Sequence, residues 1–312
     1  MNLVAAFFKL IRLPNLFFIV LTQFLFRFFV LPFVYGKPFG NFDSVKLSSP
    51  LFYLLVIASV CIAAAGYIIN DYFDVNIDLI NKPEKLVIDK YIKRRWAIVW
   101  HILLSATGFA LSGYIGYKIR NIYIPVFNLA AIAALWFYST TFKRKLLIGN
   151  ILISLLTAWV ILVLMFAEHE FTIGSPGNDW RRLLKVSFIY GGFAFIISLI
   201  REVIKDMEDV NGDVRYGCKT MPIVWGIPVS KVFTAVWMVV LIAGVGGIEV
   251  YIVQAGWLAA AIYGMAAIII PLLWALRKLY KAEIQADFHR LSNAVKLIML
   301  AGIISMIFFY FH

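Results

Sequence analysis

Long apolar runs alternate with short polar segments along the whole of this 312-residue chain. Nine of the runs are long enough to cross the hydrocarbon core of a bilayer, which takes roughly 20 residues of helix. They cover about residues 14–35, 50–70, 96–117, 121–140, 146–167, 184–204, 229–252, 256–276 and 291–311. Because a helix satisfies its own backbone hydrogen bonds in lipid, the pattern predicts an all-α, polytopic membrane protein with about nine transmembrane helices.

The composition fits this prediction. Hydrophobic residues make up 62% of the chain and the mean hydropathy is +0.88, well above the apolar share of a soluble domain. The first apolar run is too long for a cleaved signal peptide and lacks a small-residue cleavage site, so we expect it to stay in the mature protein. We expect a single membrane domain over residues 1–312.

The Lys and Arg residues are distributed unequally between the two ends of the predicted helices. With a cytoplasmic N-terminus and alternating helices, 21 of the 29 basic residues lie at cytoplasmic ends and 7 at the opposite ends, with Arg27 inside the first run. This bias predicts a multi-pass protein of the inner (cytoplasmic) membrane with its N-terminus in the cytoplasm. The basic residues lie in short loops, so nucleic-acid binding is not expected, and no obligate protein partner is evident.

The same three-carboxylate pattern occurs twice, each time after a long apolar run. Its members are Asp71, Asp74 and Asp78 and, 135 residues later, Asp206, Asp209 and Asp213. Steps of three and four residues return to one face of a helix, so each triad directs its oxygens the same way. Like charges on one face call for a counter-cation, and oxygen ligands with room for a phosphate suit Mg²⁺. Both triads fall at cytoplasmic ends, where the sequence therefore predicts a magnesium site.

The repeat also predicts an internal organisation. An offset of 135 residues indicates two similar halves, about 1–140 and 141–312, each placing an acid-tipped helix beside a common cavity. The segments after the triads, about 79–95 and 214–228, contain turn residues such as Pro83 and Gly217. We expect these segments to cap the cytoplasmic mouth of the cavity.

Basic residues lie close to both triads in the sequence. Lys82 and Lys85 follow the first triad, Arg201 and Lys205 precede the second, and Lys143 lies on a loop between them. A mouth lined by carboxylates and cations together can hold a metal-bound polyanion, such as a diphosphate.

A diphosphate held at a bilayer suggests a prenyl chain attached to it. The chain contains 27 Phe, 15 Tyr and 9 Trp, enough to line an apolar tunnel whose ring faces can stabilise an allylic cation. Among the aromatic residues, Tyr67 and Tyr138 are candidates to stabilise this cation, because each lies near the cytoplasmic end of its predicted helix.

Several segments resemble the UbiA-type intramembrane prenyltransferases. Residues 70–78 (NDYFDVNID) resemble the first acidic motif of that family, and residues 205–213 (KDMEDVNGD) with 216–222 (YGCKTMP) resemble the second. Residues 12–15 (RLPN), 138–143 (YSTTFK) and 149–150 (GN) match minor motifs in the right order. One departure is the stretch 81–86 (NKPEKL), where the family usually has an Arg-Pro-rich segment; a lysine does not offer the bidentate fork of an arginine.

The resemblance implies nine transmembrane helices around a central cavity, with a lateral opening to lipid and a cytoplasmic cap. It also implies Mg²⁺-dependent transfer of a prenyl group from a prenyl diphosphate to a lipophilic acceptor within the membrane, with two Mg²⁺ ions. In that picture Asn70, Asp74 and Asp78 hold one ion, and Asp209 and Asp213 hold the other. Asp71 and Asp206 are further ligands or support the ligands. Candidates to share the diphosphate charge are Lys82, Lys85, Lys143, Arg201 and Lys205.

Two classes of acceptor fit this resemblance. The form of the first motif resembles the geranylgeranylglyceryl-phosphate branch of the family, and the basic residues at the mouth suit two anionic substrates. The alternative is an aromatic acceptor, 4-hydroxybenzoate or a naphthoate, as in quinone biosynthesis. Two other readings are a membrane terpene cyclase, which quenches the cation internally, and a divalent-cation transporter, which would place its acids nearer the bilayer midplane.

Overall fold

The structure is a computed structural model that describes residues 2–42, 45–81, 86–169 and 177–311. Within these residues, nine helical segments are long and apolar enough to cross a membrane, which confirms the predicted number. Helices make up nearly all of the described chain, so the all-α class is also confirmed. Lys82 and Lys85 lie outside the described residues.

The helices follow one another along the chain with short connections. Their bounds are α1 Leu3–Leu10, α2 Leu13–Leu25, α3 Leu31–Val34, α4 Ser49–Asn81, α5 Arg94–Ile119, α6 Tyr123–Thr140, α7 Ile148–Glu168, α8 Asn178–Arg215, α9 Met221–Val224, α10 Gly226–Gln254, α11 Leu258–Gly264, α12 Ile270–Lys281 and α13 Gln285–Ile304. Single π-helical turns join α2 to α3 and α11 to α12, so each of these pairs crosses the membrane as one span.

Two helices are much longer than a membrane requires. The 33 residues of α4 and the 38 residues of α8 correspond to about 50 and 57 Å at 1.5 Å per residue, against a hydrocarbon core of about 30 Å. The apolar runs predicted to span the membrane end near residues 70 and 204, and the helices extend beyond them, because apolar length reports the depth of lipid and not where a helix stops. Both helices continue through their acid triads, which lie on rigid helical turns beyond the apolar core.

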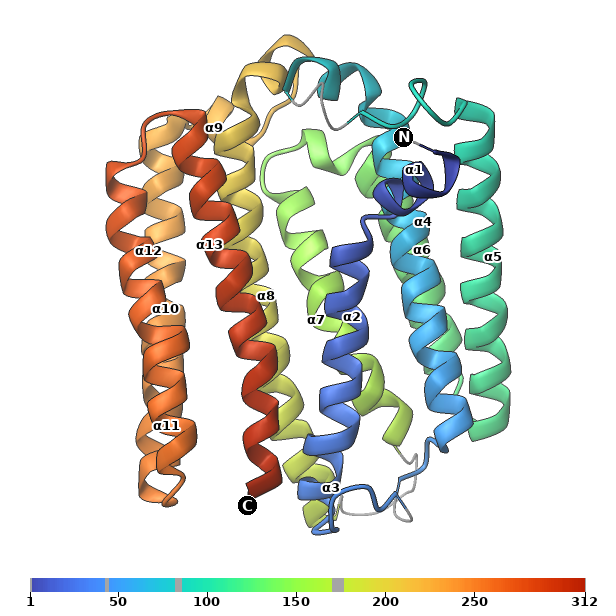
Figure 1. Ribbon diagram of the computed structural model, residues 1–312, viewed down its shortest axis with the longest axis vertical. Coiled ribbons are helices and arrows are strands. Elements are labelled where there is room, and N and C mark those ends of the chain that lie inside the picture. Colours follow the sequence, from blue (N-terminus) through green and yellow to red (C-terminus); the bar gives the residue numbers. More distant parts are fainter. Residues whose placement is uncertain (1, 43–44, 82–85, 170–176, 312) are drawn as a thin grey trace.

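Six helices form a closed ring of neighbours. The helix α2 contacts α4, α4 contacts α6, α6 contacts α7, α7 contacts α8, α8 contacts α13, and α13 contacts α2. The helix α5 packs outside α4 and α6, while α10 and α12 pack outside α8 and α13. Figure 1 shows these helices running roughly parallel, with the N-terminus, α1 and α9 at one end and α3 and the C-terminus at the other. The triads lie at the end that carries α1 and α9, and we call it the acidic end.

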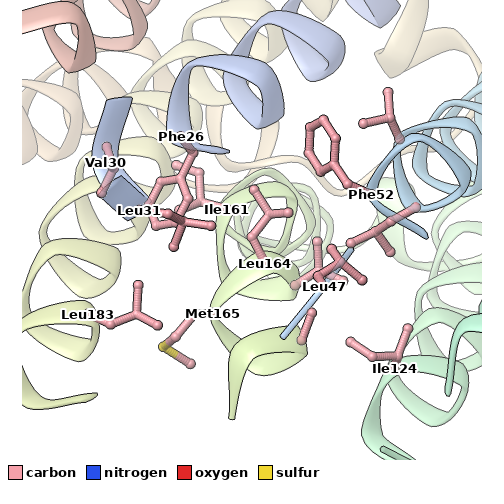
Figure 2. Close-up of a cluster of buried hydrophobic side chains, with 14 of the residues drawn as sticks. Phe26, Val30, Leu31, Leu47, Phe52, Ile124, Ile161, Leu164, Met165 and Leu183 are labelled. Carbon is pink, nitrogen blue, oxygen red and sulfur yellow. The ribbon is translucent and has the colours of Figure 1, made fainter. Parts of the chain in front are cut away.

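The opposite end of the ring is filled by an apolar cluster. Figure 2 shows part of it, with Phe26, Leu31, Leu47, Phe52 and Leu164 directed toward one another from different segments. These side chains are buried. The cluster closes the far end of the bundle, and we call it the apolar plug.

A buried charge network fixes the loop that covers this plug. Arg27 is only 1% exposed; its guanidinium donates to the carbonyl oxygen of Leu47 at 2.7 Å and lies 4.8 Å from the ring centre of Phe52. The Glu168 carboxylate accepts hydrogen bonds from the backbone N–H groups of Lys46 at 2.7 Å and Leu47 at 3.1 Å. Hydrogen-bonded charges are tolerated in this apolar setting because their polar atoms are satisfied.

The acidic end has its own packing. The residues Ala6 and Leu10 of α1, Ile68 of α4, and Val87 and Ile92 of the segment after α4 form a buried apolar cluster. This cluster holds α1 and the segment 86–92 against the helix that carries the first acidic motif. The predicted duplication into two halves stays a prediction, although the two acid-bearing helices are in direct contact.

Candidate active site

The first acidic motif is held by cations from other segments. On α4, Asp71 accepts a hydrogen bond from the Arg12 guanidinium at 2.6 Å, and Asp74 contacts the ammonium group of Lys143. Asp74 is 8% exposed, so its carboxylate is largely withdrawn from water. The charge of Asp71 raises the pKa of Arg12 above its ordinary value. The repulsion expected within the triad is therefore relieved, in this structure, by protein cations.

Asn70 is polar and buried, and one of its atoms lacks a partner. Its side-chain oxygen Oδ1 is shielded from solvent and accepts no hydrogen bond from the described residues. A buried carbonyl oxygen without a donor is costly unless a ligand or ion approaches it. It lies one residue before Asp71 and one helical turn before Asp74, so a cation bound at the motif would lie on the same face.

The second acidic motif lies on α8, which packs against α4. Asp206 accepts a hydrogen bond from the side-chain amide of Asn150 at 2.8 Å. Asp209 and Asp213 are partly buried on the following turns of the same helix. Glu208, within the same motif, is directed elsewhere, and its carboxylate is 2.9 Å from Nδ1 of His289 on α13. Glu208 therefore lies on the side of α8 that faces α13, and the three aspartates lie on the side nearer the first motif.

The segment between α6 and α7 connects the two motifs. Lys143 contacts Asp74 of the first motif, and Asn150, on the first turn of α7, binds Asp206 of the second. Gly149 makes this approach possible, because a Cβ there would lie 2.9 Å from both the Cα of Lys143 and the carbonyl oxygen of Phe142. Only a glycine allows the lysine backbone to come this close.

Lys143 lies between charges of both signs. Burial lowers its pKa to about 8, and the neighbouring Arg144 acts in the same direction, while Asp213 and Asp71 oppose the shift. Its side chain is 11% exposed. The Lys143 ammonium interacts electrostatically with aspartates of both motifs, so it lies where the two motifs converge.

A cavity of about 250 Å³ lies inside the ring, next to the motifs. Both tyrosines singled out from the sequence, Tyr67 and Tyr138, line it, as does Asn70. The guanidinium carbon of Arg12 is 5.2 Å from the ring centre of Tyr67. A smaller, almost wholly apolar cavity of about 80 Å³ shares Phe18 and four other lining residues with it. Together they offer an upper chamber that carries charged and polar side chains among apolar ones, and an apolar lower chamber.

Arg201 and Lys205 also line the upper cavity, but they are not unpaired cations awaiting a ligand. The Lys205 ammonium donates to the carboxylate of Glu202 at 2.8 Å, and Arg201 lies 3.4 Å from the same carboxylate. Glu202 lies in an apolar helical stretch, four residues before Asp206, and the sequence analysis did not single it out. Its position one turn before a triad aspartate, on the same helical face, was the available signal.

Asn15 and Lys296 were also missed as members of this site. Both line the cavity, and the Lys296 ammonium donates to the side-chain oxygen of Asn15 at 2.7 Å. They are 281 residues apart in the chain, so no local pattern relates them.

The described residues contain no group of three His, Cys, Asp or Glu side chains close enough together to hold a metal ion as they stand. The donor set nevertheless suits Mg²⁺, which prefers oxygen ligands and retains several waters, and the buried Oδ1 of Asn70 is an available oxygen. The charged groups of Lys143 and Arg12 lie beside carboxylates, at positions where a metal cation would otherwise bind.

The chain resembles known proteins over most of its length. The model of the UbiA prenyltransferase family matches residues 17–303. Digeranylgeranylglyceryl phosphate synthase of Methanothermobacter thermautotrophicus is 33% identical over 202 residues, and that of Sulfurisphaera tokodaii is 34% identical over 190 residues. These alignments cover 64% and 60% of this chain, and 63% and 62% of the relatives, which is less than two thirds of either relative.

Solved structures share the fold. A digeranylgeranylglyceryl phosphate synthase structure superposes with a TM-score of 0.63 at 23% identity, covering 98% of this chain and 99% of that one. A UbiA homologue from Aeropyrum pernix gives 0.62 at 18% identity, covering 97% and 98%. A UbiA homologue from Archaeoglobus fulgidus, solved with DMAPP and Mg²⁺, gives 0.55 at 14% identity, covering 96% and 98%. The nine apolar helices of the described residues and the family-model match over residues 17–303 together make the chain an integral, multi-pass membrane protein that belongs to the UbiA prenyltransferase family.

Proposed function

We propose that this protein transfers a prenyl group from a prenyl diphosphate to a lipid-soluble acceptor, with Mg²⁺ as cofactor. The observation that carries the proposal is the bridge from Asp74 through Lys143 and Asn150 to Asp206, which brings both acidic motifs to the mouth of one cavity. Paired carboxylates, a cation between them and an adjoining apolar chamber suit a substrate with a diphosphate head and a hydrocarbon tail.

We assign the metal ligands from the donor set. Asn70, Asp74 and Asp78 would hold one Mg²⁺, and Asp209 and Asp213 a second. The Mg²⁺ and DMAPP bound to the A. fulgidus homologue support Mg²⁺ as the cofactor by analogy of fold. When bound, the metal supplies Lewis-acid stabilisation of the negative charge on the diphosphate. We assign Asp71 and Asp206, which Arg12 and Asn150 contact, to the support of these ligands.

The protein's own cations share the charge of the leaving diphosphate. Lys143 is already beside the carboxylates, and Arg201 and Lys205 are oriented by their common partner Glu202. The bond between prenyl C1 and the diphosphate oxygen breaks, and its electron pair leaves with the diphosphate. The rings of Tyr67 and Tyr138 line the cavity beside the developing allylic cation and stabilise it through their faces.

The cation is then captured by the acceptor. For a hydroxyl acceptor, the oxygen donates its electron pair to C1, a C–O bond forms, and the hydroxyl proton passes to the departing diphosphate. We propose a phosphate-bearing glyceryl lipid as this acceptor. Support comes from the relatives named digeranylgeranylglyceryl phosphate synthase and from the four basic side chains that line the cavity.

We also propose that the acidic end faces the cytoplasm, across the cytoplasmic membrane. The excess of Lys and Arg at the ends that would lie there supports this orientation. The prenyl diphosphate, whose head group is charged and water-soluble, would then enter from the cytoplasmic side.

The test is a substrate panel. Purified protein with Mg²⁺ is given prenyl diphosphates of several lengths and, in turn, geranylgeranylglyceryl phosphate, 4-hydroxybenzoate and a naphthoate, and the products are identified by mass. We expect the prenylated glyceryl phosphate as the main product, and no product in excess chelator. A prenylated aromatic as the main product would overturn the acceptor, and diphosphate release without an adduct would point to a cyclase instead.

A further inference from the structure

The central cavity has an excess of positive charge. Among the described residues that line it, Arg12, Arg201, Lys205 and Lys296 are basic, and Glu202 is the one acidic side chain. Like charges gathered in a low-dielectric chamber repel one another until an anion enters. The cavity itself, apart from the acidic motifs at its mouth, therefore favours an anionic ligand.

Lys296 differs from the other three cations in its partner. Arg12 pairs with Asp71, and Arg201 and Lys205 share a carboxylate, whereas the ammonium of Lys296 donates to the neutral side-chain oxygen of Asn15 at 2.7 Å. No carboxylate among the described residues pairs with Lys296, and the guanidinium groups of Arg201 and Arg12 repel it. An anion can thus bind Lys296 without breaking an ion pair, which is the costly step at a paired cation.

Lys296 is also separate from the aspartates proposed to hold the metal-bound diphosphate. The described lining of its cavity includes Asn70 but none of the six triad aspartates and not Lys143. Lys143 lies with the aspartates, in contact with Asp74. The site therefore has Lys143 among the acids and, inside the chamber, Lys296, which differs from Arg201 and Lys205 in having no carboxylate partner among the described residues.

The surroundings of Lys296 combine this charge with an apolar path. Its ammonium lies 5.2 Å from the ring centre of Phe18, and Met299, one turn further along α13, lines both the upper and the lower cavity. Phe18, Ile19 and Val160 also line both cavities. A ligand with an anionic head at Lys296 can extend a hydrocarbon chain past Met299 into the apolar chamber.

We propose that Lys296, oriented by Asn15, binds the phosphate monoester of the lipid acceptor, apart from the diphosphate of the donor. This inference rests on the proposed function and specifies how the acceptor is held. The acceptor hydroxyl, a few bonds from that phosphate, is thereby kept in the same cavity as Tyr67 and Asn70. In this role Lys296 determines specificity, because a neutral acceptor has no anionic group for the ammonium to bind.

The test compares Lys296→Gln with Lys296→Arg and with Lys278→Gln, in liposomes of zwitterionic lipid. Lys278 is an exposed lysine of α12 that lies against Trp274 and does not line the cavity, so its substitution controls for the loss of one charge. A charge-assisted hydrogen bond corresponds to a change of about 10- to 100-fold in affinity. We expect Lys296→Gln to raise KM for geranylgeranylglyceryl phosphate by about that factor and to leave KM for the prenyl diphosphate unchanged. Lys296→Arg should restore most of the affinity, and Lys278→Gln should behave as wild type.

Two further comparisons test whether Lys296 binds the phosphate of the acceptor and whether Asn15 orients it. The dephosphorylated glyceryl ether should show the same KM with wild type and Lys296→Gln, because it lacks the group that the lysine binds. Asn15→Ala, which leaves the lysine in place without its orienting partner, should raise the acceptor KM by a smaller factor. Equilibrium binding of radiolabelled geranylgeranylglyceryl phosphate, without donor or Mg²⁺, should weaken in parallel with KM.

Several results would overturn the inference. An unchanged acceptor KM in Lys296→Gln, or equal increases for donor and acceptor, would mean that Lys296 does not distinguish the acceptor. Competition by anionic phospholipid that disappears in Lys296→Gln would mean that the lysine holds bulk membrane phosphate. If wild type prenylates only aromatic acceptors, the proposed function fails, and the binding arm still decides whether Lys296 binds a lipid phosphate.

Discussion

Asp74→Asn separates the role of this carboxylate in the reaction from its role in folding. The substitution keeps the size of the side chain and removes its negative charge. In the structure Asp74 is largely buried and in contact with the Lys143 ammonium. Under the proposed function it is also a ligand of Mg²⁺, so its negative charge serves both the ion pair with Lys143 and the binding of the metal.

The effect on activity should be large. Loss of one preorganised electrostatic contact at a reacting group costs about 3–4 kcal/mol of transition-state stabilisation, and loss of a metal ligand is at least comparable. At about 1.4 kcal/mol per factor of ten, kcat/KM should fall by at least 100- to 1,000-fold.

The effect on stability should be much smaller. Breaking a fully buried ion pair costs about 3–5 kcal/mol because a charge is left without a partner. Lys143, however, has a pKa of about 8, so at pH 7 its ammonium can release a proton for about 1.4 kcal/mol. The destabilisation is therefore limited to about 1–2 kcal/mol, or a fall in Tm of about 2–6 °C.

The assay measures prenyl transfer with saturating Mg²⁺ and thermal unfolding in detergent for the same preparations. Asp89→Asn is the matched control, since Asp89 forms an exposed ion pair with Arg94 at the same end of the molecule, 2.7 Å apart, and such pairs contribute little. Asn also tolerates the left-handed backbone of that position. Near wild-type turnover in Asp74→Asn, or a loss of activity matched by wholesale unfolding, would refute the reasoning.

Three other predictions concern topology and packing. Cys218 is 5% exposed and burial raises its pKa, so it should react slowly with an impermeant thiol reagent at pH 7.5, whereas Tyr216→Cys, at a 41% exposed position, should label fast and only from the cytoplasmic side; fast labelling from outside intact cells would invert the orientation. Glu168→Ala should destabilise by about 3–5 kcal/mol in thermal unfolding, because one buried and one partly buried N–H group lose their acceptor, and an unchanged Tm would contradict the network. Gly302→Ala should cost about 1–3 kcal/mol, since its Cβ would come within 2.3 Å of the Phe193 ring, and a stabilised variant would show that the ring moves freely.

The features predicted from the sequence are those that lipid imposes locally. The nine spans were found because each must supply its own apolar length, and the triads because their spacing of three and four places carboxylates on one helical face. The ends of α4 and α8 do not follow from hydropathy, because the turns beyond residue 70 and beyond residue 204 are stabilised by packing outside the lipid, such as that of Val75 with Ile92 and that of Met207.

The features that were missed depend on pairing across the fold. Glu202 could not be distinguished as the common partner of Arg201 and Lys205 until α8 was seen to line the cavity. The pairing of Asn15 with Lys296 joins the first and the last spans, and nothing local to either residue indicates it. Charge counts predict that cations gather at one end, but only tertiary packing assigns each cation a partner.

The apolar plug has an electrical consequence. A membrane potential of 100 mV is worth about 2.3 kcal/mol for each charge that crosses the whole field, and the field falls mainly across the part of a protein that water does not enter. Arg12 lines the cavity and its side chain is 36% exposed, and we expect solvent at the acidic end to reach the upper chamber. The potential should then drop across the plug of Phe26, Leu31 and Leu164 below it. Anionic substrates would bind without moving charge through the field, and we expect turnover to be the same in energised and de-energised vesicles.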